Sequence, residues 1–160
     1  MKNVVLFMFI FFQMSFGIDL YRGESEKSIF SFNTKKGKKL SICVDEKNKN
    51  VIYRYGTTNK IELQKESLGN KKVFTGSFYM RGGGPSNAGM DLNYFSFING
   101  NYKYTVYYEY YSEGNSQSLG IKIKNLKSDK EFDVKGDIET KKGSLLSFKF
   151  DYPELVSRLD

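Results

Sequence analysis

Hydrophobic and polar side chains alternate along most of this chain, and that alternation predicts β-strands. The clearest case is 102–111, where every second position is tyrosine or valine. Successive side chains of a strand point to opposite faces, so four tyrosines and Val106 share one face while Tyr107 and Tyr111 lie on the other. The same pattern predicts shorter strands at 30–32, 40–44, 51–55, 60–64, 72–80, 94–98, 121–124, 131–134 and 145–150.

Polar turns separate these strands at short intervals. Residues 33–37 and 45–50 are polar, and Asn99-Gly100 is a dipeptide typical of a two-residue hairpin turn. A short helix is expected at 153–160. Many short strands joined by such turns predict an all-β fold, a single antiparallel sandwich or barrel of about 8–10 short strands.

Residues 1–17 have the pattern of a secretory signal peptide. Lys2 precedes an unbroken apolar run at 4–12, and Ser15 and Gly17 place small side chains before a cleavage site. The run is much shorter than the ~20 residues of a membrane-spanning helix, and a buried core element is its alternative interpretation. We therefore expect export to the periplasm or secretion, a flexible segment at 18–27, a β domain at 28–160 and no transmembrane segment.

The net charge and the rare or absent residue types limit the partners and the catalytic chemistry that this protein can have. The chain has 25 Lys and Arg against 18 Asp and Glu, and its net charge falls from +7 to +6 without Lys2. This surplus favours acidic partners and anionic envelope surfaces, but no nucleic-acid motif is present. Histidine is absent, which excludes Ser-His-Asp triads, Cys-His dyads and imidazole metal sites. Cys43, the single cysteine, stands in a predicted strand and is expected to be buried.

Arg81, Gly82, Gly83 and Gly84 open the one glycine-rich segment of the sequence. The segment lacks the Lys-Ser/Thr ending of a phosphate-binding loop, and it is expected to run from strand to strand rather than into a helix. Two interpretations remain open. The segment is either a hairpin loop whose glycines allow positive φ, or a binding loop carried by a rigid sheet.

Two further candidate sites lie on predicted strands. Arg54 and Glu62 stand on neighbouring strands, so they form either a structural cross-strand ion pair or, if Arg54 is exposed, an anchor for an acidic partner. Tyr104 and Tyr108 share a strand face. They either pack at the edge of the core or present rings to a protein partner or a sugar.

Two stretches of the sequence resemble a family of small, uncharacterised exported proteins of Gram-negative bacteria. The first runs from Lys38-Lys39-Leu40-Ser41-Ile42-Cys43 through Tyr53-Arg54-Tyr55-Gly56 to Ile61-Glu62-Leu63. The second runs from Gly82-Gly83-Gly84 through 95–107, with its Asn-Gly turn and Tyr-x-Tyr strand, to Gly120-Ile121-Lys122-Ile123. The resemblance implies an exported β domain and points to Arg54, Glu62 and the glycine loop, but it implies no reaction. Family members carry further cysteines, whereas this chain keeps Cys43 alone and has no partner for a disulfide.

These observations favour a non-catalytic binding protein without a cofactor or a metal, one version being an inhibitor or immunity-like protein for an envelope-acting enzyme. In that version Arg81 and 82–89 approach an acidic cleft of the partner. The alternative is a β domain that binds a small ligand, a glycan or a lipid in a pocket lined by Arg54, Tyr104 and Tyr108. A hydrolase built on two carboxylates is the third possibility.

Overall fold

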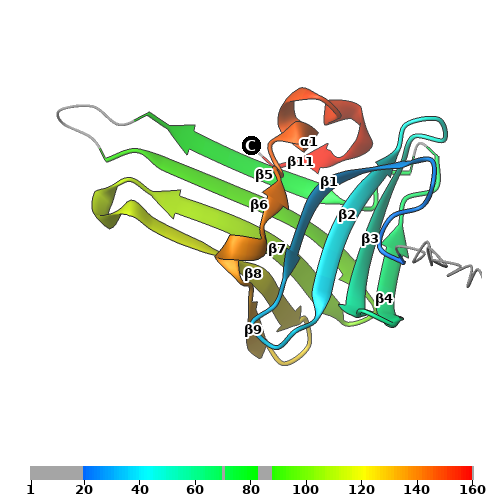
Figure 1. Cartoon of the computed structure of the whole chain (residues 1–160), viewed down its shortest axis with the longest axis horizontal. Helices are drawn as coiled ribbons and strands as arrows, with labels where there is room; N and C mark the ends of the chain where they lie inside the picture. The colour runs from blue at the N-terminus through cyan, green and yellow to red at the C-terminus, as the bar shows by residue number, and fades with distance from the viewer. Residues whose placement is uncertain (1–19, 70, 83–87, 160) are drawn as a thin grey trace, which may run out of the picture.

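Two β-sheets pack face to face as a sandwich in the computed structural model, which describes residues 20–69, 71–82 and 88–159 (Figure 1). The predicted signal peptide at 1–17 lies outside the described residues. The first sheet has the order β10 (Lys142–Gly143), β1 (Glu26–Asn33), β2 (Lys39–Asp45), β3 (Asn50–Thr57), β4 (Lys60–Glu66). The second has the order β11 (Ser157–Arg158), β5 (Thr75–Arg81), β6 (Met90–Asn99), β7 (Tyr102–Tyr111), β8 (Ser116–Asn125), β9 (Glu131–Lys135).

The expected all-β class is confirmed, and of the two expected architectures the structure has the sandwich. Neighbouring strands are antiparallel except for β11, which lies parallel to β5. Asn99 pairs with Tyr102, so the two residues of the hairpin turn are Gly100 and Asn101, one residue later than predicted. Gly100 has a positive φ of 59°. Within the described ranges, no helix has the length and apolar character needed to cross a membrane.

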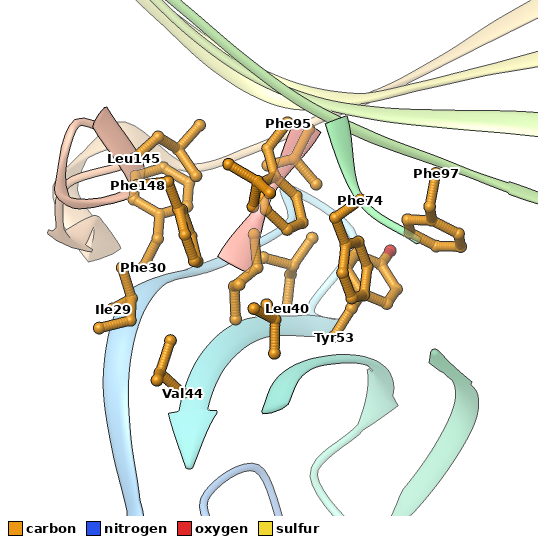
Figure 2. Packing of buried hydrophobic residues seen from close by; sticks show 14 of the residues in the cluster. Ile29, Phe30, Leu40, Val44, Tyr53, Phe74, Phe95, Phe97, Leu145 and Phe148 are labelled. Atoms are coloured by element: carbon orange, nitrogen blue, oxygen red, sulfur yellow. The ribbon is translucent and has the colours of Figure 1, made fainter. Parts of the chain in front are cut away.

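Aromatic side chains fill the space between the sheets (Figure 2). Phe74 lies 4.9 Å from Phe95, and Phe95 lies 4.8 Å from Phe148, measured between ring centroids. Tyr53 from the first sheet meets Phe97 from the second at 4.8 Å. Burying each such side chain contributes about 1.5–3 kcal/mol, so this cluster is the main source of cohesion between the sheets. The interior is therefore packed with side chains.

The C-terminal region differs from the sequence-based expectation. The strand expected at 145–150 is instead a connector followed by the short helix α1 (Ser147–Phe150). Leu145 and Phe148 are both buried, and a spacing of three residues brings them to one side of a helix but to opposite faces of a strand. The helix expected at 153–160 is reduced to the single turn η3 (Pro153–Leu155), after which the chain extends into β11.

One end of the second sheet extends past the first sheet (Figure 1). Strands β6, β7 and β8 have ten residues each, whereas β1 has eight and β2 seven. We call residues 78–82, 88–93 and 108–117 the projecting end; it includes the 3₁₀ turn η1 (Glu113–Asn115).

Candidate functional site

The projecting end exposes large side chains on both faces of β5. Tyr79 is 49% exposed and Met80 is 52% exposed. Because they are consecutive in a strand, Tyr79 lies on the outer face with Leu92, its partner on β6, and Met80 lies on the inner face. This end of the sheet therefore offers apolar surface in both directions.

The outer edge of β5 is open along the same segment. β11 pairs only with Thr75 and Gly76, and the carbonyl of Gly76 accepts a hydrogen bond from the amide of Leu159. Backbone groups of an edge strand alternate in direction, so the N–H and C=O of Phe78 and Met80 also point away from β6. No described strand pairs with 77–81 on that side, and these groups are free to bind another strand.

Arg81 is the last residue of β5, and Gly82 follows it. The Nε of Arg81 donates to the carbonyl of Ala88 at 3.1 Å, and Ser112 exchanges hydrogen bonds with Gly89 across the tip. Together with Met80, Asp91, Tyr110 and neighbouring residues, Arg81 and Gly82 line a shallow depression of about 350 Å³. Gly83 and Gly84 lie outside the described residues.

Asn93 lies at the inner border of the projecting end and is 1% exposed. Its side-chain amide donates to Oδ1 of Asp91 at 2.8 Å. Its own Oδ1 accepts no hydrogen bond from any described residue, and an unsatisfied buried acceptor costs about 1–3 kcal/mol. The core therefore becomes polar where the projecting end begins.

Tyr104 and Tyr108 share a strand face and both pack, partly buried, against the core, but their other contacts differ. Tyr104 stacks on Phe97 with centroids 5.1 Å apart and belongs to the core packing. Tyr108 donates to Oε1 of Gln117 at 3.2 Å, carries the Nζ of Lys141 at 4.7 Å from its ring centroid, and has a pKa raised by burial. Tyr108 therefore belongs to the projecting end and Tyr104 does not.

The expected ion pair between Arg54 and Glu62 is wrong. Arg54 instead forms a bidentate pair with Glu26, at 2.5 and 2.7 Å, and its Nε donates to Gln64 at 3.2 Å. Glu62 accepts from Nζ of Lys38 at 2.5 Å. The register of β3 and β4 places Gln64, not Glu62, opposite Arg54, and Glu62 falls at a bulge between Tyr55 and Gly56 without a cross-strand partner.

Residues 20–25, which we call the N-terminal strap, lie across the outer face of β2 and β3 next to this pair (Figure 1). Tyr21 is 2% exposed, and its carbonyl accepts hydrogen bonds from the hydroxyl of Ser41 and the thiol of Cys43. Burial of Cys43 is confirmed, and desolvation is the main cause that raises the pKa of its thiol to about 11. The described part of the segment expected to be flexible at 18–27 is thus hydrogen-bonded to the sheet, and β1 begins at Glu26.

The sequence-predicted residues therefore lie in three places. Arg54 and Glu62 are on the first sheet, Tyr104 packs against the core, and Arg81, Gly82 and Tyr108 are at the projecting end. The four main hollows found among the described residues have none of Arg54, Tyr104 and Tyr108 in their lining. The described residues also contain no cluster of three metal-ligating side chains.

The exposed pair of Tyr79 and Met80 was missed by the sequence analysis. Two consecutive large apolar residues at the end of a predicted strand were the available signal, because strict alternation would place only one of them in the core. Comparisons with protein-family models, curated proteins and solved structures give no match. The geometry of the projecting end therefore carries the functional argument.

Proposed function

We propose that this protein is an exported, non-catalytic binding protein that takes a protein partner with its projecting end. The observation that carries the proposal is the exposure of Tyr79 and Met80 on opposite faces of an edge strand whose outer side is open. Soluble proteins usually protect such edges with lysine, proline or a covering loop. Here the described edge at 77–81 has none of these before Arg81.

The residue types at the projecting end fit a protein interface. Tyrosine, methionine and arginine are enriched in interfaces, and tyrosine and arginine carry much of the binding energy. The open edge of β5 adds backbone groups that favour an extended segment of the partner, in the manner of strand addition. Tyr79 would then lie against one side of that segment and Met80 against the other.

The charged side chains at the projecting end change the kind of partner surface that we expect. Among the described residues of the projecting end itself, Arg81 is the one basic side chain, beside the acidic Asp91, Glu109 and Glu113. The ammonium groups of Lys141 and Lys122 reach Tyr108 and Glu109 from outside it. An acidic cleft is therefore not required of the partner, and an apolar groove with one carboxylate for Arg81 fits better. The projecting end supports an inhibitor or immunity-like role, in which strands β5–β8 present this end to the cleft of an envelope-acting enzyme.

The test uses residues 18–160 as bait in periplasmic and culture extracts, with captured proteins identified by mass spectrometry and their affinity then measured. Replacing Tyr79 and Met80 together by serine should weaken binding at least tenfold, and Arg81→Ala should weaken it further. The matched control replaces Ile98 and Phe132 by serine, since these are 56% and 59% exposed on other parts of the same sheet.

Equal loss of affinity in the test and control variants would contradict the assignment of the projecting end. Unchanged affinity in the Tyr79 and Met80 variant would contradict it as well. Thermal unfolding of each variant checks that its fold is intact. Because the substituted side chains are about half exposed, the melting temperature should stay close to that of the unsubstituted protein.

A further inference from the structure

A second hollow lies on the outer face of the first sheet, whereas the projecting end belongs to the second sheet. It has a volume of about 590 Å³ and lies over β10, β1 and β2, between the N-terminal strap and the 3₁₀ turn η2 (Ile138–Thr140). Figure 1 shows the orange segment that contains η2 and β10 alongside β1. The core lies on the other side of this sheet, and Phe32 is the one core residue in the described lining. We call it the outer groove.

Small side chains on the outer face create this groove. Ser31 pairs directly with Ser41 across β1 and β2, and Lys142 of β10 pairs with Ser31 on the other side. Directly opposed residues have Cβ atoms about 4.5–5.5 Å apart, so two neighbouring serines leave a depression wider than one strand. Tyr21 and Thr140 line opposite sides of it.

The strap wall is held firmly in place. The Tyr21 carbonyl accepts from Ser41 at 2.7 Å, and the Tyr21 hydroxyl donates to the Thr57 carbonyl at 2.6 Å. The pair between Glu26 and Arg54 fixes the point where the strap becomes β1. The opposite wall is also fixed, because the hydroxyl of Thr140 accepts from the amide of Asn33 at 2.8 Å. The groove is thus built into the fold.

The described side chains that line the groove carry charge of one sign only. Arg22, Lys39 and Lys142 line it, and none of the described lining residues is acidic. Lys39 places its Nζ at 4.8 Å from the centroid of the Tyr21 ring. Arg22 and Lys142 are exposed, and neither forms an ion pair with a described residue. Such a concave positive surface attracts anions.

The lining also specifies what else the ligand carries. Hydroxyls of Ser28, Ser31 and Thr58 donate and accept hydrogen bonds, which matches the hydroxyl groups of a sugar or polyol. The aromatic rings of the lining, Tyr21 and Phe32, are buried and offer no face on which a nucleobase can stack. The volume lies in the range typical of small-molecule sites.

We propose that the outer groove binds a small organic anion rich in hydroxyl groups, of the sugar phosphate or sugar acid class. The guanidinium of Arg22 and the ammonium of Lys142 hold the phosphate or carboxylate, because charge-assisted hydrogen bonds are the strongest available there. The serine and threonine hydroxyls hold the sugar. The site is independent of the partner proposed for the projecting end.

The experiment titrates residues 18–160 with four probes and measures heat of binding and amide chemical shifts. Glucose 6-phosphate or glucuronate should bind at least tenfold more tightly than glucose and than inorganic phosphate. A preference between the two sugar anions distinguishes phosphate from carboxylate recognition. Affinity should fall as salt is raised, since the charged groups are exposed.

Two variants localise the site. Replacing Arg22 and Lys142 together by glutamine should weaken sugar-anion binding at least tenfold, whereas the same change at Lys47 and Lys127 should leave it unaltered. The control residues are likewise exposed and basic and lie outside the described ion pairs, so the change in net charge is matched. Ser28→Phe should also abolish binding, since it fills the groove without changing charge.

Three outcomes would overturn the proposal. The first is a sugar anion that binds no more tightly than inorganic phosphate or glucose. The second is an equal loss in the Arg22 and Lys142 variant and in the control, which would indicate diffuse attraction. The third is binding that survives Ser28→Phe in a protein whose thermal unfolding is unchanged.

Discussion

The ion pair between Glu26 and Arg54 should contribute measurably to stability, and Glu26→Gln tests this. Both side chains are nearly buried, with 11% and 12% of their surfaces exposed, and the pair is bidentate. A hydrogen bond to a charged group contributes about 1.5–3 kcal/mol net. Glutamine keeps one acceptor oxygen but removes the charge opposite a largely desolvated guanidinium. We therefore expect the free energy of unfolding to fall by about 2 kcal/mol at neutral pH.

The assay is urea unfolding at several pH values. Hydrogen bonds from Arg54 are the main cause that lowers the pKa of Glu26 from its ordinary value of 4.5. A carboxyl with a lowered pKa stabilises the fold above its unfolded pKa and loses that stabilisation as the pH falls through its folded pKa. The difference between the unsubstituted protein and Glu26→Gln should therefore be full at pH 7 and shrink below about pH 4.5.

Glu62→Gln is the matched control for this prediction. Glu62 pairs with Lys38, but both side chains are about one third exposed, so solvent screens the pair and no measurable change in stability is expected. A gap between Glu26→Gln and the unsubstituted protein that stays constant from pH 7 to pH 3 would refute the electrostatic reasoning. Equal effects of the two substitutions at pH 7 would refute the argument from burial.

Three further predictions test the packing. Cys43 should resist a thiol reagent at pH 8 in the native protein and react once urea unfolds it, because it is buried and its pKa is raised to about 11; rapid native labelling would contradict this. Gly120→Ala should destabilise by about 1–3 kcal/mol in urea unfolding, since a Cβ there would lie 2.5 Å from a backbone carbonyl, whereas Gly82→Ala meets nothing within 4 Å and should be neutral. Phe148→Ala should lower the free energy of unfolding by about 3–5 kcal/mol, because Phe148 is buried. Phe150→Ala should lower it by less than about 0.5 kcal/mol, because Phe150 is 63% exposed. Similar losses for both would instead support the strand predicted at 145–150.

The sequence by itself determined the fold class and most strand positions, because alternation and turn chemistry act over a few neighbouring residues. The strand at 102–111 was predicted with the bounds that β7 has. The turn at Asn99-Gly100 was placed within one residue, since glycine alone readily supplies the positive φ that the turn needs. Cys43 was predicted to be buried from its place in an apolar strand.

Contacts between residues distant in the sequence decided the partner of Arg54, the formation of helix α1 and the positions of the candidate sites. The register of β3 and β4 places Gln64 opposite Arg54, and Glu26, 28 residues before Arg54, supplies the carboxylate expected from Glu62. Helix α1 forms where alternation predicted a strand, because the core accepts Leu145 and Phe148 from the same side. The outer groove likewise depends on the N-terminal strap lying on β2 and β3. The exposure of the projecting end depends on how far the first sheet covers the second. Residue patterns specify local geometry, but the pairing of remote segments sets burial and the positions of sites.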